Sequence, residues 1–169
     1  QSVLWLNQIG GNGYDVINSI INDNKGNIYI TGGFSDTVDF DPSGNTSNLE
    51  GTVNTGSFIA KYDTSGNYIW AKRIGGNNNT VSNCITIDKI GNIFIAGRFS
   101  GTNDFDPSIN TANLTSIGVE DMFYAKYDTS GNYIWAKRLG GTSFDAGSSI
   151  ALDDANNVYV IGDFEGTAD

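Results

Sequence analysis

The chain contains no histidine, a single cysteine and only two prolines. Without histidine it lacks the commonest general base and metal ligand of enzymes, which excludes a serine–histidine–aspartate triad and its relatives. Because Cys84 is the one cysteine, neither a disulfide within the chain nor a cysteine metal cluster can form. These absences argue against most familiar kinds of catalytic centre.

Positive charge is also scarce. The sequence has 9 Lys and Arg against 19 Asp and Glu, a net charge of −10. Nucleic acids and anionic membrane surfaces attract basic proteins, so we expect neither as a partner. No apolar run reaches the roughly 18 residues that a membrane-spanning helix needs, so we do not expect membrane insertion either.

What the chain does contain is a repeat with a period of 65 residues. Trp5, Trp70 and Trp135 fall on this period. The segment 56–76 returns as 121–141, with 17 of 21 positions identical. Self-similarity at a fixed period is the signature of stacked structural units, and the 169 residues hold about 2.6 of them.

Each repeat reads as four strands. In the second copy these are residues 82–88, 92–99, 122–127 and 133–139. Three of them alternate apolar and polar residues, and 92–99 begins with a continuous apolar run, which is typical of a strand covered on both faces. Turns of the form Asp-x-x-Gly-Asn join the strands in pairs, and in the last such turn Asn156 replaces the glycine.

The pattern predicts an all-β fold of tandem four-stranded antiparallel blades with a 65-residue period, as part of a β-propeller. A β-solenoid is the alternative, although its coils are much shorter than this repeat. We interpret residues 1–169 as one partial propeller. Its expected parts are an orphan fourth strand in 1–10, repeats at 11–75 and 76–140, and half a repeat at 141–169. Because a closed ring usually has four to eight blades, we expect further blades in the same chain or in other subunits.

The repeated motifs also point to a family. Three segments resemble the bacterial SBBP-type β-propeller repeat. They are residues 20–32 (IINDNKGNIYITG), residues 85–97 (ITIDKIGNIFIAG) and residues 123–141, the last of which contains YDTSGNYIWAK. This resemblance implies an exported or cell-surface bacterial protein, in some cases a substrate of type IX secretion. It implies no catalytic activity. The expected location is therefore extracellular or at the bacterial cell surface.

Two repeated acidic pairs are candidates for a metal site. Asp39 and Asp41, and their counterparts Asp104 and Asp106, each place two carboxylates near one another on an extended segment. Calcium prefers such oxygen ligands, and it is the one cofactor that the sequence suggests. The alternative is that one aspartate of each pair caps the Asp-Pro turn and the other faces water.

Three other residues are candidates for binding. Trp70 and Trp135 could line a carbohydrate-stacking surface, or they could pack between blades. Arg98 differs from its repeat counterparts, Gly33 and Asp163, and variation at one repeat position is how a propeller can create a specific site.

Taken together, these features favour a non-enzymatic module at the cell surface that acts as a scaffold, an adhesin or a binding surface for a protein or glycan. Two alternatives stay open. One is a glycan-active enzyme that uses two carboxylates. The other is a passive stalk whose function lies in other domains.

Overall fold

The computed structural model describes residues 5–52 and 54–167, and its regular structure in these residues is entirely β-strand. No helix in this part of the chain is long and apolar enough to cross a membrane. The strands are β1 (Asp15–Asn22), β2 (Ile28–Phe34), β3 (Thr37–Asp39), β4 (Asn48–Glu50), β5 (Gly56–Tyr62), β6 (Tyr68–Ile74), β7 (Thr80–Ile87), β8 (Ile93–Phe99), β9 (Thr102–Asp104), β10 (Asn113–Thr115), β11 (Asp121–Tyr127), β12 (Tyr133–Leu139), β13 (Asp145–Leu152) and β14 (Val158–Phe164).

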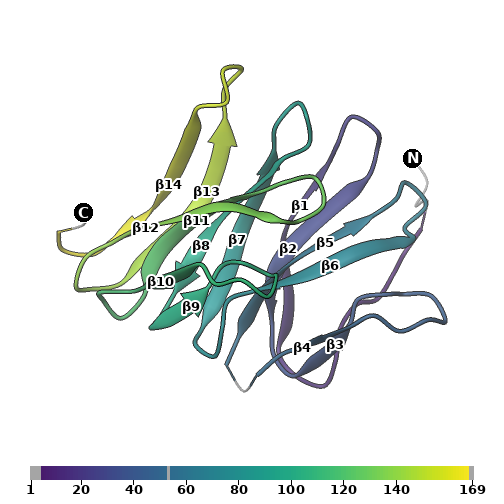
Figure 1. The fold of residues 1–169 in the computed structure, drawn as a ribbon, viewed down its shortest axis with the longest axis horizontal. Coiled ribbons are helices and arrows are strands. Elements are labelled where there is room, and N and C mark those ends of the chain that lie inside the picture. Colours follow the sequence, from purple (N-terminus) through teal and green to yellow (C-terminus); the bar gives the residue numbers. More distant parts are fainter. Residues whose placement is uncertain (1–4, 53, 168–169) are drawn as a thin grey trace.

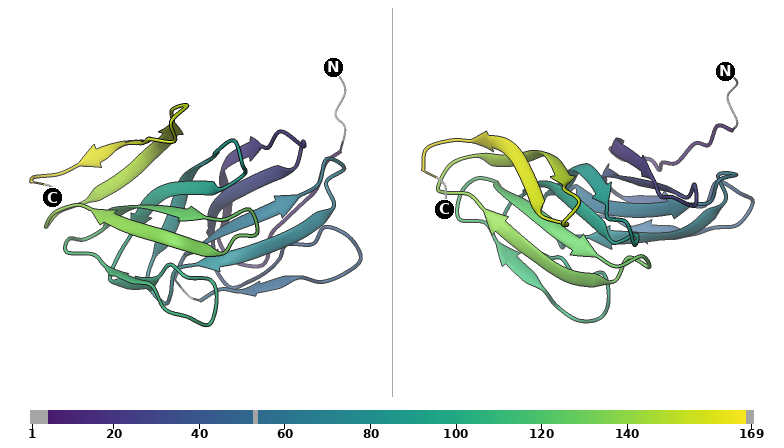
Figure 2. Two further views of the ribbon diagram at one scale, coloured as in Figure 1. Left: turned by 45° about the horizontal axis from the view of Figure 1, so that its top comes forward. Right: turned by 90° about the horizontal axis from the view of Figure 1, so that it is seen from above.

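The strands form two complete blades and half of a third. Blade 1 is a four-stranded sheet in the order β1-β2-β5-β6, and blade 2 repeats it as β7-β8-β11-β12. All neighbouring strands are antiparallel, and the β13–β14 hairpin supplies the first half of blade 3. The blades follow one another as layers of an open arc from the N-terminal to the C-terminal end (Figures 1 and 2). The prediction of tandem four-stranded antiparallel blades is confirmed.

The Asp-x-x-Gly-Asn turns have the geometry that their sequence requires. In the turn from β7 to β8, Oδ1 of Asp88 accepts hydrogen bonds from the backbone N–H groups of Ile90 and Asn92 at 3.1 and 2.8 Å. Gly91 has φ +91°, a left-handed conformation that is costly for residues with a side chain. Asn156 takes the same role in blade 3 with φ +62°.

These turns make the stability of the folded protein depend on pH. Hydrogen bonds from the Asn67 side chain, and then from its backbone, lower the pKa of Asp63 below its ordinary value of 3.8, and Asn157 does the same for Asp153. A pKa that is lower in the folded state contributes stability above the unfolded value, and that contribution is lost as the pH falls through the folded value. We therefore expect the midpoint temperature of thermal unfolding to drop when the pH is lowered below 3.8.

A double substitution, Asp63→Asn with Asp153→Asn, keeps a side-chain oxygen in each turn and removes two titrating groups. Its thermal midpoint should therefore fall less steeply with pH than that of the wild type. Thermal unfolding followed by circular dichroism at a series of pH values measures the difference. Parallel slopes for the two proteins would show that these turns do not carry the acid sensitivity.

A small hairpin extends each blade between its second and third strands. Strands β3–β4 in blade 1 and β9–β10 in blade 2 form it. The sequence pattern places the acidic pairs on an extended segment but does not predict this hairpin. The fully buried Phe105 anchors the second hairpin, because its ring packs against Phe99 and Phe123 with centroids 5.5 and 4.8 Å away. The hairpin thereby extends the core of the blade.

We predicted an orphan fourth strand in residues 1–10. This prediction is wrong for the described residues 5–9, which form no strand. Residues 1–4 lie outside the described residues. Gly10 makes a single bridge to Asp39, and otherwise the segment is held by side chains that reach the turn between β5 and β6. A β-strand needs a partner edge for its backbone groups, and none of the described strands pairs with residues 5–9.

Burial at equivalent positions shows how the blades stabilise one another. Ile20 in blade 1 is 65% exposed, whereas its counterpart Ile85 in blade 2 is 6% exposed because blade 1 packs over it. On the opposite side of the sheet, Tyr159 in blade 3 is 57% exposed and its counterpart Phe94 is 1% exposed. Burying such a side chain is worth about 1.5–3 kcal/mol. A large part of the core therefore lies between blades, and a second cluster, which includes Phe34, Phe40 and Phe58, lies within blade 1 and its hairpin.

Candidate functional site

The strand ends create two different rims. We call the rim that carries the five Asp-x-x-Gly/Asn-Asn turns, among them 23–27 and 88–92, the turn face. The opposite rim carries the other connections, among them 75–79, 116–120 and 140–144, and we call it the loop face. The register places them at opposite ends, because Ile28 pairs with Tyr62 at one end of blade 1 and Phe34 with Gly56 at the other.

The repeated tryptophans join blades. The half-buried Trp70 of blade 1 packs edge-to-face on Tyr29, with ring centroids 6.4 Å apart. A Cβ atom on Gly131, in the turn between β11 and β12 of blade 2, would lie 3.0 Å from the Trp70 ring. Trp5 approaches the equivalent turn of blade 1, where its Nε1 donates to the carbonyl of Thr64 at 3.2 Å. This is the packing role that the repeat allowed.

Trp135 repeats the aromatic contact of Trp70 within its own blade, since Phe94 is the counterpart of Tyr29. It is half buried and packs edge-to-face against Phe94 and Tyr124, with centroids 6.1 and 5.7 Å away. The ammonium group of Lys137 lies 5.8 Å from its ring centroid. Carbohydrate stacking on Trp70 or Trp135 stays a prediction.

The acidic pairs fasten the hairpin loops. Oδ1 of Asp39 accepts hydrogen bonds from the N–H groups of Asp41 and Ser47 at 3.0 and 2.8 Å. Asp104 repeats this arrangement with Asp106 and Ala112. In the part of the chain that the structure describes, no group of three or more His, Cys, Asp or Glu side chains gathers as a metal site. Calcium binding by Asp39, Asp41, Asp104 and Asp106 stays a prediction.

Arg98 contributes to a divergent patch on the loop face. Its Nε lies 2.8 Å from Oε2 of Glu120, and Ile117 and Val119 in the same loop are 61% and 71% exposed. We call Arg98, Ile117, Val119 and Glu120 the loop-face patch. Blade 1 has Gly33, Thr52, Asn54 and Thr55 at the equivalent positions. The structure thus places the variable arginine beside exposed apolar side chains that sequence reasoning missed.

A buried ion pair supports this loop. Oδ2 of Asp121 lies 2.6 Å from Nη1 of Arg138, and Asp121 is fully buried. Its carboxylate also accepts the backbone N–H groups of Ile117 at 3.0 Å and Gly118 at 3.1 Å. Blade 1 repeats the arginine as Arg73 but has Gly56 in place of the aspartate. That one substitution within an otherwise repeated segment was the available sequence signal, and we had not used it.

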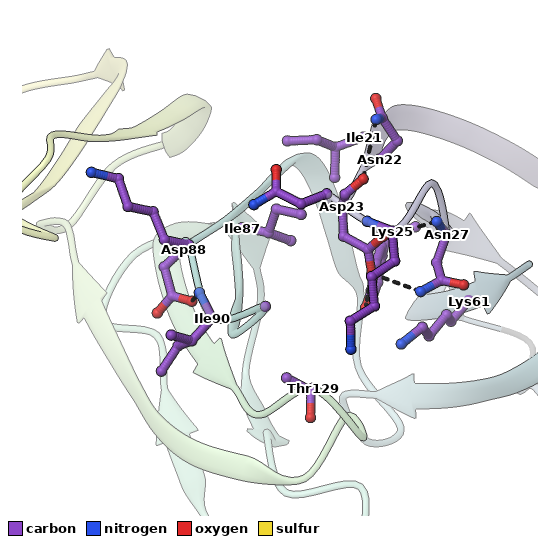
Figure 3. Close-up of a pocket in the computed structure, with 14 residues that line it drawn as sticks. Ile21, Asn22, Asp23, Lys25, Asn27, Lys61, Ile87, Asp88, Ile90 and Thr129 are labelled. Carbon is purple, nitrogen blue, oxygen red and sulfur yellow. Dashed lines mark hydrogen bonds between the residues drawn. The ribbon is translucent and has the colours of Figure 1, made fainter. Parts of the chain in front are cut away.

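The turn face carries a groove between blades 1 and 2, with a cavity of about 450 Å³ (Figure 3). The turns 23–27 and 88–92 form its two sides, and Lys61 and Thr129 also line it. We call it the inter-blade groove. Burial raises the pKa of the Asp23 carboxyl, but hydrogen bonds from Asn27, Lys25 and Tyr29 outweigh it and bring the pKa below its usual value. Asp23 is therefore ionised and held by its own turn.

The four-stranded blades, their turns and the stacking of one blade on the next define a β-propeller repeat protein. Comparison with known proteins agrees with this class of fold. The family model described as "SBBP: Beta-propeller repeat" matches residues 69–106 and 134–163, which supports the repeat type.

Two curated relatives match most of the chain. This chain is 34% identical, over 151 residues or 84% of its own length, to a WD repeat-containing protein of Acanthamoeba polyphaga mimivirus. It is 26% identical over 137 residues, 81% of its length, to the regulatory protein FlaEY of Caulobacter vibrioides. The chain spans 11% and 14% of these relatives.

Proposed function

We propose that this chain is part of a non-enzymatic β-propeller that serves as a scaffold and binds a partner protein through the loop-face patch. The observation that carries the proposal is the divergence of that patch within an otherwise regular framework. Blade 2 exposes Ile117 and Val119 where blade 1 has Thr52 and Asn54. A residue that only builds the blade has no reason to become apolar and exposed in one repeat.

The patch has the composition of a protein interface. Two branched aliphatic side chains project from one loop, and the Arg98–Glu120 ion pair lies beside them. Protein interfaces commonly combine an apolar centre with a polar rim. A partner that covered Ile117 and Val119 would gain about 1.5–3 kcal/mol for each side chain fully buried.

The backbone under the patch is already ordered. Asp121 holds the N–H groups of Ile117 and Gly118, and the N–H of Val119 donates to the carbonyl of Ser143 at 3.1 Å. A loop that is ordered before binding loses less conformational entropy in the complex. The buried ion pair therefore supports binding as well as stability.

Other features favour binding over catalysis. The repeated tryptophans and aspartates have structural contacts in both blades, and the chain has no histidine. The names of the two relatives, a WD repeat-containing protein and a regulatory protein, are compatible with this role.

Export to the bacterial cell surface, adhesion and a glycan partner belong to the proposal on the strength of the sequence resemblance alone. Fractionation of the native cells tests the location. Recovery in the soluble interior would overturn the cell-surface part.

A repeat swap tests the binding role. Ile117→Thr with Val119→Asn gives blade 2 the residues of blade 1, and Ile109→Gly is the matched control, since Ile109 is exposed at the tip of the β9–β10 hairpin and its counterpart is Gly44. Proteins cross-linked to the wild type in native cells are quantified by mass spectrometry. We expect the swap to lower recovery of a specific partner about tenfold, as losing about 1.4 kcal/mol does.

Three results would contradict the proposal. Equal recovery with the swap and the control would favour the passive stalk. A loss with Ile109→Gly alone would place the interface on the hairpin. Hydrolysis of a glycan that depends on a carboxylate such as Asp39 would favour the enzyme. Matching thermal midpoints for the two variants would confirm that the comparison concerns binding and not folding.

A further inference from the structure

We infer that the inter-blade groove on the turn face binds a small acidic sugar, such as a uronic acid residue, with Lys25 and Lys61 holding its carboxylate. This site lies on the rim opposite the loop-face patch and does not depend on the proposed protein partner. The inference rests on where the chain places its few positive charges, and on how this groove differs from the next one.

The groove is rich in lysine although the chain is acidic. The sequence contains six lysines and has a net charge of −10, yet three of those lysines, Lys25, Lys61 and Lys89, line this one cavity. Figure 3 shows Lys25 and Lys61 extending toward the same region of the groove, across from Thr129. Asp23 and Asp88 also line the cavity, and the ammonium group of Lys89 is paired with Asp154 of blade 3. The ammonium groups of Lys25 and Lys61 repel one another, and an anion between them relieves that repulsion.

Neither Lys25 nor Lys61 has a carboxylate partner among the ion pairs of the described residues. The ammonium group of Lys61 instead lies over the ring of Tyr29, 4.8 Å from its centroid. The nearby Asp23 is engaged by donors of its own turn, with Oδ1 accepting the N–H groups of Lys25 and Asn27 at 2.9 Å each. Both ammonium groups therefore keep donors for a ligand.

The equivalent positions between blades 2 and 3 are occupied differently. There the ammonium group of Lys126, the counterpart of Lys61, also lies over an aromatic ring, 4.8 Å from the centroid of Phe94, but it is in addition 3.9 Å from Oδ2 of Asp88. Lys89 crosses to Asp154 of blade 3 in an ion pair of 2.7 Å, and Ile90 replaces Lys25. In the first groove the residues at the crossing positions are Asn24 and Lys89, which form no such pair. Lys25 and Lys61 are thus without an ion pair in the groove between blades 1 and 2, whereas at the equivalent positions of blade 2 one lysine is replaced by Ile90 and the other, Lys126, lies near a carboxylate.

The rest of the lining suits a hydroxylated ligand. The side chains of Asn22 and Asn24 and the hydroxyl of Thr129 offer both donors and acceptors, and Ile21 and Ile87 supply an apolar wall. A cavity of about 450 Å³ accommodates a ligand of the size of a sugar residue. A lysine pair for a carboxylate, together with amides and a hydroxyl for sugar hydroxyls, is the chemistry of an acidic sugar.

Titration of the purified protein with glucuronate, glucose and acetate, followed by calorimetry, tests the site. Lys25→Ile introduces the residue that blade 2 already has in this turn, and Lys61→Met keeps the aliphatic stem over Tyr29. Lys137→Ala is the matched control, because it removes an exposed lysine of β12 that does not line the groove. Thermal unfolding of each variant confirms that it folds.

We expect glucuronate to bind at least about tenfold more tightly than glucose or acetate, and each groove variant to weaken it about tenfold or more, as the loss of one charged hydrogen bond of about 1.5–3 kcal/mol does. The Lys137→Ala variant should bind like the wild type. Glucuronate affinity that is unchanged in both groove variants would overturn the site. Acetate binding as tightly as glucuronate would overturn the assignment to a sugar.

Discussion

Asp121→Ala is expected to lower the free energy of unfolding by about 3 kcal/mol, because removing one partner of a buried ion pair leaves the other charge uncompensated. Asp121 is fully buried, and it accepts hydrogen bonds from Arg138 and from the N–H groups of Ile117 and Gly118. The substitution leaves the two N–H groups without this acceptor and leaves Arg138 with only the carbonyl of Gly140. Urea unfolding followed by circular dichroism measures the loss.

The control for this prediction is Asp154→Ala. Asp154 also forms an ion pair, with Lys89 at 2.7 Å, but both side chains are largely exposed. Exposed pairs contribute about 0–1 kcal/mol, so this variant should unfold close to the wild type. If Asp121→Ala cost no more than Asp154→Ala, the ion pair beneath the loop-face patch would not be the support that we describe. Partner binding should weaken in Asp121→Ala, because the loop loses its anchor.

Trp70→Ala is expected to cost about 3 kcal/mol, at the lower end for truncation of a tryptophan in a core, because the side chain is only half buried. The ring fills the space between Tyr29 of its own blade and Gly131 of the next. Without it, the contact between the fourth strand of blade 1 and the turn of blade 2 opens. Thermal and urea unfolding report the effect.

Ile69→Ala is the control for the tryptophan. Ile69 is adjacent in β6 and 44% exposed, so its truncation should cost about 1 kcal/mol. A Trp70→Ala variant as stable as Ile69→Ala would indicate that the tryptophan does not join the blades. It would also revive the alternative that Trp70 serves a carbohydrate-binding surface.

The repeat made most of the fold predictable. Alternation with a period of two residues located three of the four long strands of a blade, and a continuous apolar run located the other. The steric demand of the turns explained why Asn156 could replace glycine. The same repeat left packing between blades as one of two roles for the tryptophans, and Trp70 has that contact. These features depend on local sequence and recur in each copy, so one sequence already contains several examples of them.

The features that were missed have no periodic signal of their own in the sequence. Strands β3, β4, β9 and β10 have three residues each, too few to show a period. The Asp121–Arg138 pair joins residues on neighbouring strands. The inter-blade groove brings together turns one period apart, and its character depends on which lysines find a carboxylate. Composition and spacing do not contain this information.

The account rests on the face-to-face packing of successive blades, which forms the core and the groove alike. The hydroxyl groups of Ser57 in blade 1 and Ser82 in blade 2 contact each other across this interface, and both residues are fully buried. The most direct measurement is therefore disulfide formation in Ser57→Cys with Ser82→Cys, built on Cys84→Ser, a substitution that repeats 1 and 3 already contain as Ser19 and Ser149. Mass spectrometry of the digested protein should recover the peptides of residues 57 and 82 as one disulfide-linked species. Free thiols at both positions in the folded protein would contradict the stacked-blade architecture.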